Sequence, residues 1–243
     1  MTIYSYLDAT PEQINEYVAR GLLDRAEHPE FPLSMLTYGR ETVHNNAWDH
    51  VTLRCRGIIF NRETGEVIAR PFEKFFNLGT ANMPETDPES PEFMKNLSAE
   101  PDWTMTQPTV YEKVDGFLCT LYRWNGTEYI ASKGSFTSPH AKWATAWYRK
   151  HRNGIHIWPE DYTPVFEGIC PDLRIVVNYK ERNELILLAL IKIETGEELN
   201  PTSLRTWGTG NDINTPLLNN LTWQEASIRA LAPTENEEGF VLT

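Results

Sequence analysis

The spacing of apolar residues predicts a helix close to the start of the chain. Thr10-Pro11-Glu12-Gln13 has the form of a capping box, with proline at the first helical position. The apolar residues that follow recur at helical intervals: Ile14, Tyr17, Val18, Leu22 and Leu23. A second capping box, Thr222-Trp223-Gln224-Glu225, predicts a helix near the C-terminal end, and residues 140–150 carry a further helical pattern.

Strand patterns fill most of the remaining chain. Val51–Phe60 is predicted to be extended, with a turn at 61–65 and Glu66–Phe72 as its hairpin partner. A second hairpin joins Phe117–Trp124 to Glu128–Ser132 through Asn125-Gly126, a pair that favours a tight turn. Further strands are predicted from residue 108 and at 164–169, 174–179, 184–193 and 238–243.

These elements predict the fold class. Strands dominate, and the alternation of strand and helix that is typical of parallel sheets does not occur. We therefore expect an α+β fold of largely antiparallel sheets with flanking helices. Residues 84–102 contain four prolines and six acids, a composition typical of an exposed connector. We expect an N-terminal part over 1–103 and a core over 104–243.

Composition excludes several classes of protein. The longest apolar run, Leu185–Ile191, has seven residues, far fewer than the roughly 20 that span a bilayer. The three cysteines are scattered and form no C-x-x-C motif, which argues against both a disulfide framework and a zinc site. We expect a protein of the reducing cytoplasm with no membrane partner.

The formal net charge of −12 does not exclude a polyanionic partner. Segments 84–102 and 193–243 carry −5 and −6, which is nearly the whole imbalance. Residues 103–182 contain ten Lys and Arg against eight Asp and Glu. Because screening limits the reach of a charge to about 8 Å, a locally basic surface on an acidic protein can still bind phosphates.

The most distinctive short motif is Lys113-Val114-Asp115-Gly116, between two predicted strands. Asp and Gly are depleted inside strands, so their position here is unusual. Taken alone, the motif fits a hairpin turn with a solvated lysine as well as it fits a catalytic site. Other motifs elsewhere in the chain change this balance.

Four motifs occur in the order found in the covalent nucleotidyltransferases, the superfamily of RNA ligases, DNA ligases and mRNA-capping guanylyltransferases. The chain resembles this superfamily at Lys113–Gly116, Ser132–Ser135, Phe166–Gly168 and Glu238–Val241. Two upstream segments, CRGIIF at Cys55–Phe60 and RPFEKFFN at Arg70–Asn77, resemble the phage T4-type RNA ligases of the tRNA-repair family. The resemblance extends from about Arg54 to the C-terminus.

This resemblance implies a ligase adenylation-domain core, unrelated to the ATP-grasp fold, that uses ATP with Mg²⁺ or Mn²⁺. Lys113 is implied as the adenylylated nucleophile. The other implied nucleotide-binding residues are Arg56, Lys74, Asp115, Gly116, Lys133, Glu167 and Glu238. The resemblance implies that Lys74 contacts the phosphates, Lys133 the phosphate or nucleotide pocket, Glu167 the ribose, and Glu238 the metal ion.

The residue types suit this chemistry. A lysine attacks phosphorus only as the free amine, and an ordinary lysine pKa near 10.4 leaves little free amine at neutral pH. Burial and neighbouring cations lower a lysine pKa, and the same cations balance the charge of a triphosphate. A carboxylate is a hard oxygen ligand of the kind that Mg²⁺ prefers.

One part of the pattern is missing. The superfamily closes its core with a later K-x-K strand, whereas the sequence ends five residues after Glu238. The helical C-terminal domain of the tRNA-repair ligases is missing as well. Three explanations stay open: a fragment, half of a split enzyme whose second chain supplies the lysine motif, or a degenerate nucleotide- or RNA-binding protein. An unfinished sheet edge is unusual in a monomer, which favours the first two.

We therefore expect ATP-dependent ligation of 5′-phosphate and 3′-hydroxyl RNA ends through a lysyl-AMP intermediate, in RNA or tRNA repair. The protein would act in the host cytoplasm if the chain is of phage origin. The alternatives are a DNA ligase, a capping enzyme, or a non-catalytic module that binds nucleotide or RNA ends. A basic segment at 140–156 either binds RNA phosphates or is the solvated side of a helix, and the pattern favours neither. Trp143 and Trp147 within it are predicted core residues.

Overall fold

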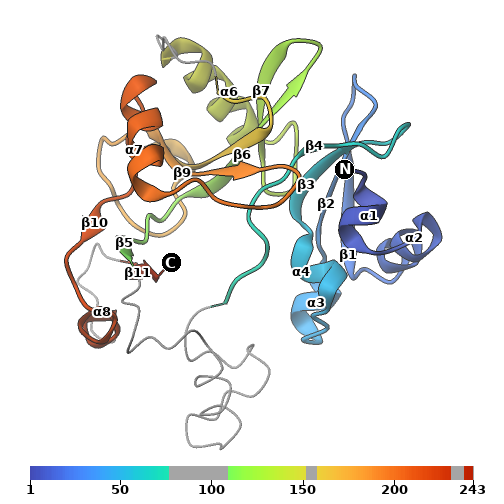
Figure 1. The fold of residues 1–243 in the computed structure, drawn as a ribbon, viewed down its shortest axis with the longest axis horizontal. Helices are drawn as coiled ribbons and strands as arrows, with labels where there is room; N and C mark the ends of the chain where they lie inside the picture. The colour runs from blue at the N-terminus through green and yellow to red at the C-terminus, as the bar shows by residue number, and fades with distance from the viewer. Residues whose placement is uncertain (77–108, 152–157, 231–237, 243) are drawn as a thin grey trace, which may run out of the picture. The chain divides into compact units, whose positions relative to one another are not determined.

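The computed structural model describes residues 1–76, 109–151, 158–230 and 238–242 (Figure 1). The chain forms two units, and each unit is built from two separate stretches. Unit 1 comprises Met1–Lys74 and Asp115–Thr215, and unit 2 comprises Phe75–Val114 and Pro216–Thr243. The predicted connector at 84–102 and the predicted boundary between residues 103 and 104 lie outside the described residues.

Unit 1 begins with two short helices, α1 (Ile3–Leu7) and α2 (Pro11–Ala19). The predicted capping box at α2 is confirmed, because the Thr10 hydroxyl and the Gln13 side chain each accept a hydrogen bond from the other residue's backbone N–H. The helix ends earlier than predicted. Gly21 adopts a left-handed conformation with φ of +69°, and Leu23 opens the first strand instead of extending the helix.

The first sheet of unit 1 has four antiparallel strands in the order β1-β2-β3-β4. These are β1 (Leu23–Glu27), β2 (Leu33–Tyr38), β3 (Arg56–Asn61) and β4 (Val67–Ala69). The predicted hairpin is present as β3 and β4, and its turn is closed by a 2.7 Å hydrogen bond from the Gly65 N–H to the Asn61 carbonyl. Apolar residues of α1, α2 and this sheet share one core, which includes Ile3, Leu7, Ile14, Leu36 and Ile58.

Two helices between β2 and β3 were not predicted: α3 (Arg40–His44) and α4 (His50–Arg54). The prediction that the chain is extended from Val51 is therefore wrong over its first four residues. Asp49 explains the difference. Its carboxylate accepts hydrogen bonds from the N–H groups of Val51 and Thr52, at 3.0 and 2.8 Å, and this cap starts a helix where the apolar pattern alone suggests a strand.

The second sheet of unit 1 is also antiparallel, in the order β7-β6-β8-β9. Its strands are β6 (Phe117–Trp124), β7 (Thr127–Ser132), β8 (Tyr162–Ile169) and β9 (Glu184–Lys192). The β6–β7 hairpin turns at Asn125-Gly126, as predicted, and both residues have positive φ.

Two helices join the core of the second sheet. The predicted helix is α6 (Pro139–His151), whereas α7 (Pro201–Gly210) was not predicted. Ala144 and Tyr148 of α6 are buried there with Leu204 of α7. Trp143 and Trp147 pack against the same cluster, in agreement with their prediction as core residues.

Residues 174–179 are not a strand, contrary to the prediction. They follow a short 3₁₀ turn, η1 (Pro171–Leu173), and form a loop between β8 and β9. The backbone N–H groups of Val176 and Val177 donate to the carboxylate of Asp115, at 2.9 Å for Val176. This β-branched run therefore satisfies hydrogen bonds on a distant side chain instead of a neighbouring strand.

Unit 2 contains a three-stranded antiparallel sheet in the order β10-β5-β11. Its strands are β10 (Leu218–Asn219), β5 (Val110–Glu112) and β11 (Phe240–Leu242). The helix α8 (Trp223–Ala230) begins at the predicted capping box, in which the Thr222 N–H donates to the Glu225 carboxylate at 2.8 Å. β5 thus lies between two strands that come from the last part of the chain.

The fold class is α+β, as predicted, and every pair of named strands in the described ranges is antiparallel. Cys55, Cys119 and Cys170 are buried and free. No helix within the described part of the chain is long and apolar enough to cross a membrane.

Candidate active site

Three of the predicted cationic residues lie around one tyrosine in unit 1. Arg56 opens β3, Lys74 follows β4, and Lys133 follows β7. The Lys133 Nζ donates a 3.0 Å hydrogen bond to the hydroxyl of Tyr38, at the end of β2, and lies 4.4 Å from the centre of its ring. The Lys74 Nζ lies 5.7 Å from the ring of Trp48, which itself contacts the Tyr38 ring edge-on at 5.1 Å.

Backbone contacts hold the three cations near one another. Gly57, directly after Arg56, has a φ of +97°, and a Cβ there would lie only 2.7 Å from the carbonyl oxygen of Lys133. Only glycine combines this conformation with so close an approach. The N–H of Lys74 donates to the Leu53 carbonyl at 2.7 Å, which ties it to the end of α4.

The pKa values of Lys74 and Arg56 are lowered, in both cases mainly by burial. Burial, together with the charges of Arg56 and Lys133, lowers the pKa of Lys74, against the opposing effect of Tyr38. Burial likewise lowers the pKa of Arg56, while Tyr38 and Glu167 act in the opposite direction. A concentration of partly buried cations favours the binding of a polyanion, since each added negative charge relieves their mutual repulsion.

The pKa of Tyr38 is displaced by the same charges. Burial acts to raise the pKa, but the hydrogen bond from Lys133 and the charges of Lys133, Arg56 and Lys74 outweigh it. The pKa of Tyr38 therefore lies below its ordinary value. Tyr38 and Trp48 are site residues that the sequence analysis missed, because no local motif marks an aromatic residue that faces distant cations.

The second half of the nucleophile motif lies against the predicted ribose-binding residue. A Cβ at Gly116 would come within 2.3 Å of the Gly168 carbonyl oxygen and 3.1 Å of the Glu167 side chain. The β6–β8 pairing brings these residues together, with Leu118 opposite Glu167. Burial lowers the pKa of Arg56 and the charge of Glu167 acts to raise it, so Gly116, Glu167 and Arg56 belong to one region of unit 1.

Asp115 has a role in unit 1 that sequence reasoning did not identify. Besides accepting hydrogen bonds from Val176 and Val177, it donates its own N–H to the hydroxyl of Tyr179 at 2.9 Å. The residue is buried, with 8% of its surface exposed. Asp115 therefore fixes the loop over 174–179, and this loop helps to line a pocket whose walls also include Gly116 and Gly168.

Unit 2 holds the predicted nucleophile. Lys113 directly follows β5, and its N–H donates to the Gly239 carbonyl at 3.0 Å. The Lys113 Nζ forms an ion pair with the carboxylate of Glu238, and about a third of each side chain is exposed. Two residues that are 125 positions apart in the sequence are thus side by side.

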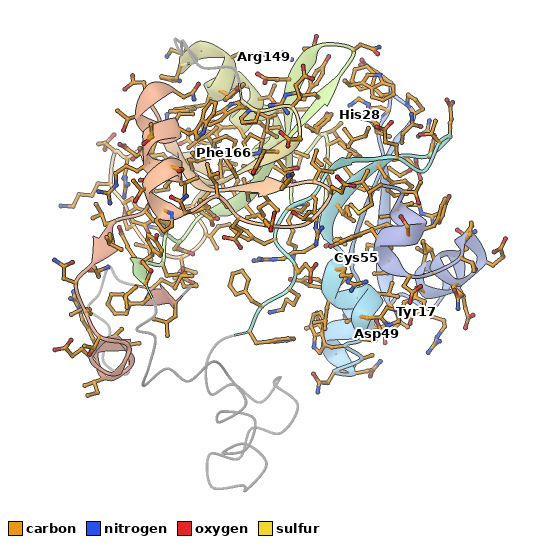
Figure 2. The ribbon with its side chains drawn as sticks, in the orientation of Figure 1. Tyr17, His28, Asp49, Cys55, Arg149 and Phe166 are labelled. Carbon is orange, nitrogen blue, oxygen red and sulfur yellow. The ribbon has the colours of Figure 1, made fainter. Side chains whose placement is uncertain are left out.

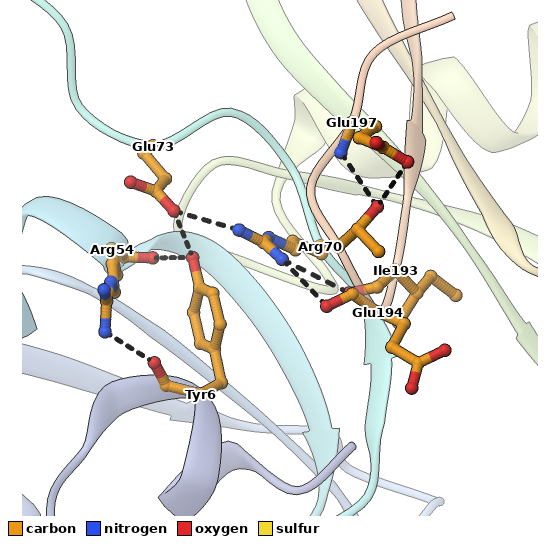
Figure 3. Close-up of polar contacts among 8 residues, drawn as sticks. Tyr6, Arg54, Arg70, Glu73, Ile193, Glu194 and Glu197 are labelled. Carbon is orange, nitrogen blue, oxygen red and sulfur yellow. Dashed lines mark hydrogen bonds and ion pairs between the residues drawn. The ribbon is translucent and has the colours of Figure 1, made fainter.

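A polar network in unit 1 holds the segment that leads to Lys74 (Figure 3). The Tyr6 hydroxyl donates to Glu73 at 3.2 Å, and Arg70 donates to the same carboxylate at 3.1 Å. Arg70 also reaches the backbone carbonyl of Glu194, and Arg54 donates to the carbonyl of Tyr6. Burial and the carboxylate of Glu73 raise the pKa of Tyr6. The network was not predicted, since its members are far apart in the sequence.

The described site residues offer few ligands for a divalent ion. Within the described residues, no three His, Cys, Asp or Glu side chains are grouped as metal ligands. Mg²⁺, however, is commonly bound by one or two carboxylates together with substrate phosphates. Glu238, beside Lys113, is compatible with that mode of binding.

The fold is that of a nucleotidyltransferase-type ligase. An archaeal ATP-dependent RNA ligase has a TM-score of 0.60 and 14% identity, over 99% of this chain and 60% of that one. A putative ATP-dependent DNA ligase from Aquifex aeolicus has a TM-score of 0.59 and 16% identity, over 96% of this chain and 58% of that one. A family model described as RNA ligase matches residues 54–243, so the chain belongs to the RNA ligase family.

Individual relatives agree with this assignment. A putative RNA ligase of Thermovibrio ammonificans is 32% identical over 149 residues, which are 59% of this chain and 35% of that protein. RNA ligase 1 of bacteriophage TS2126 is 33% identical over 155 residues, 60% of this chain and 36% of that protein. The matched part of the chain spans about a third of the length of these two relatives.

Proposed function

We propose that this chain carries the nucleotidyltransferase activity of an ATP-dependent RNA ligase and joins 5′-phosphate to 3′-hydroxyl RNA ends. The observation that carries the proposal is the cluster of Arg56, Lys74 and Lys133 around Tyr38 in a chain with a net charge of −12. Membership of the RNA ligase family supports the same chemistry.

The reaction has three steps. The free amine of Lys113 attacks the α-phosphorus of ATP, a P–N bond forms, the bond to pyrophosphate breaks, and the amine proton is released. The 5′-phosphate of one RNA end then takes AMP from the lysine, which leaves a pyrophosphate linkage at that end. Finally, a 3′-hydroxyl attacks the activated 5′-phosphate, a phosphodiester forms, and AMP leaves.

The family resemblance implies a role for each residue, and the contacts of the residues within each unit support these roles. Arg56, Lys74 and Lys133 bind the phosphates and the departing pyrophosphate, and Tyr38 orients Lys133 toward them. Glu167 accepts hydrogen bonds from the ribose, and Gly116 leaves room beside it. Glu238 holds Mg²⁺ or Mn²⁺, which supplies charge neutralisation on the phosphates when bound.

The proposal extends to the biological context. The RNA ends belong to broken RNA or tRNA under repair, and the chain works in the cytoplasm, where three free buried cysteines are compatible with reducing conditions. We further propose that a second chain supplies additional lysines in trans. Addition of such a chain should then raise the rate of adenylylation.

Intact-mass spectrometry tests the first step directly. The chain is incubated with ATP and Mg²⁺, and we expect a gain of one AMP that added pyrophosphate reverses. GTP in place of ATP should give no gain. Lys113→Ala should abolish the gain, while Lys192→Ala, at the end of β9, should retain it. An unchanged wild-type mass would contradict the proposal for this chain, and label on Lys113→Ala would contradict the choice of nucleophile.

A further inference from the structure

The exposed side of α6 carries positive charge and no acid. Lys142, Arg149 and Lys150 are exposed, and the 13-residue helix contains no Asp or Glu. Its opposite side is built into the core through Ala141, Ala144 and Tyr148. Within the described residues, no ion pair involves any of the three cations.

The sequence around α6 extends this bias. From Tyr129 to Pro159, 31 consecutive residues contain five Lys and Arg and no Asp or Glu. The chain as a whole contains 34 acids and only 22 Lys and Arg. The exposed side of α6 is therefore a basic surface on an acidic protein. It attracts an anionic partner although the net charge of the whole chain is negative.

The acid that precedes α6 in the sequence does not neutralise this surface. Glu128, the nearest acid before α6 in the sequence, has a side chain that is only 9% exposed. It accepts hydrogen bonds from Arg123 at 3.3 Å and from the Tyr148 hydroxyl at 2.8 Å. Its charge is thus directed into the core and is balanced by Arg123.

Arg149 is ordered in an outward position. Its guanidinium lies 5.1 Å from the centre of the Tyr129 ring, beside the β6–β7 hairpin (Figure 2). The Tyr129 ring in turn stacks on Tyr122, with 5.5 Å between centres. A guanidinium that rests on an aromatic face keeps its N–H groups at the edge, where they can reach phosphate oxygens with little loss of side-chain entropy.

Stability of the helix does not explain the whole pattern. Arg149 and Lys150 lie in the last turn, where the helix dipole favours positive charge. Lys142 lies close to the first turn, where the dipole favours negative charge and where α6 has no acid. A selection for helix stability alone would place an acid at that end.

The start of α6 is tied to the phosphate-binding cluster. The Ser138 hydroxyl accepts a hydrogen bond from the Ala141 N–H, and it lies 2.9 Å from the hydroxyl of Ser132, the residue before Lys133. Thirteen residues of helix extend for about 20 Å at 1.5 Å per residue. The basic side of α6 thus leads away from Lys133 over a length that several backbone phosphates can follow.

We propose that the exposed side of α6 binds the phosphate backbone of the RNA strand whose end is being joined. This inference rests on the proposed function for the identity of the RNA as substrate. It adds a surface outside the adenylylation chemistry: Lys142, Arg149 and Lys150 bind phosphates without regard to base sequence.

The test compares two triple variants of the full chain with equal loss of charge. The first is Lys142→Gln, Arg149→Gln and Lys150→Gln, which keeps helix propensity nearly constant. The matched control is Arg20→Gln, Arg40→Gln and Arg205→Gln, three exposed cations of unit 1 outside α6. The probe is a fluorescein-labelled single-stranded RNA of 20 nucleotides with a 5′-phosphate, and its binding is measured by anisotropy across a range of salt concentrations.

We expect the α6 variant to lower the slope of log affinity against log salt by about 2, since each phosphate contact with a single strand contributes about 0.7. At 0.15 M salt this corresponds to a loss of affinity of roughly 50-fold. The control should bind RNA within about twofold of wild type, because interactions with distant exposed charges are largely screened. Both variants should gain AMP from ATP as wild type does.

Equal RNA binding by the two variants would overturn the inference, and so would the absence of RNA binding by the wild type. Displacement of the RNA by poly-glutamate as readily as by unlabelled RNA of equal charge would also overturn it and assign the surface to acidic proteins. These readouts do not require adenylylation. A wild-type chain that binds RNA through α6 but gains no AMP would therefore contradict the proposed function alone.

Discussion

Replacement of Gly57 by alanine tests how unit 1 holds its cations together. The φ of Gly57 is +97°, and an added Cβ would lie 2.7 Å from the Lys133 carbonyl oxygen. The left-handed backbone costs an alanine about 1–2 kcal/mol, and overpacking against a fixed backbone atom costs about 1–3 kcal/mol more. We expect Gly57→Ala to lower the free energy of unfolding by about 2–5 kcal/mol.

Gly126 provides a matched control for this change. It also has a positive φ, +74°, but a Cβ there would have nothing within 4 Å. Gly126→Ala therefore incurs the backbone cost of about 1–2 kcal/mol without the contact. Thermal unfolding resolves the two variants, since 1 kcal/mol shifts Tm by about 2–4 °C in a chain of this size.

The same pair of variants separates stability from catalysis. If the Gly57 contact sets the spacing of Arg56 and Lys133, its loss should slow AMP uptake by about 100-fold, the effect of a misplacement near 1 Å. Gly126→Ala should take up AMP at the wild-type rate. If Gly57→Ala matched Gly126→Ala in both Tm and AMP uptake, the close approach would not position the cations, and the reasoning would be refuted.

Two further predictions concern Tyr38 and Asp115. Because the pKa of Tyr38 is lowered, tyrosinate absorbance of the folded protein should appear at a pH below about 10, and Tyr38→Phe should remove this early component. A lowered pKa in the folded state means that ionised Tyr38 adds to the free energy of unfolding. This addition is present above the unfolded pKa and is lost as the pH falls through the folded pKa. The free energy of unfolding of wild type should therefore increase relative to that of Tyr38→Phe as the pH rises. Asp115→Ala removes the acceptor of two backbone N–H groups and should lower the free energy of unfolding by about 2–4 kcal/mol. Trypsin should then cleave faster after Arg174 and Lys180, because the loop is no longer held. Unchanged cleavage at these two residues would show that Asp115 does not hold the loop.

Local signals in the sequence predicted a large part of the fold. The capping boxes at Thr10 and Thr222 and the Asn125-Gly126 turn depend on neighbouring residues alone, and each is confirmed. The two wrong strand predictions have another origin. Val51 lies in a helix because of the Asp49 cap, and residues 174–179 form a loop because their N–H groups bind a side chain about 60 residues away.

The candidate site likewise contains residues that local sequence motifs predict and residues that they do not. The three cations and Lys113 were expected because the sequence resembles the nucleotidyltransferase motifs that carry such residues in the same order. Tyr38 and Trp48 were not predicted, since an aromatic residue acquires its role only when the folded chain brings Lys133 and Lys74 beside it. The pairing of Glu238 with Lys113 likewise needs the β5–β11 register, which no single segment encodes.

The placement of β5 has a consequence for synthesis of the protein. The strand that leads into Lys113 pairs on both sides with segments from the last stretch of unit 2, β10 and β11. A chain that grows from its N-terminus therefore contains Lys113 long before the sheet beside it can form. Residues 216–243 take about 1–6 s to add at 5–20 residues per second. Until these residues are added, β5 lacks both of its strand partners and Lys113 lacks its ion-pair partner Glu238.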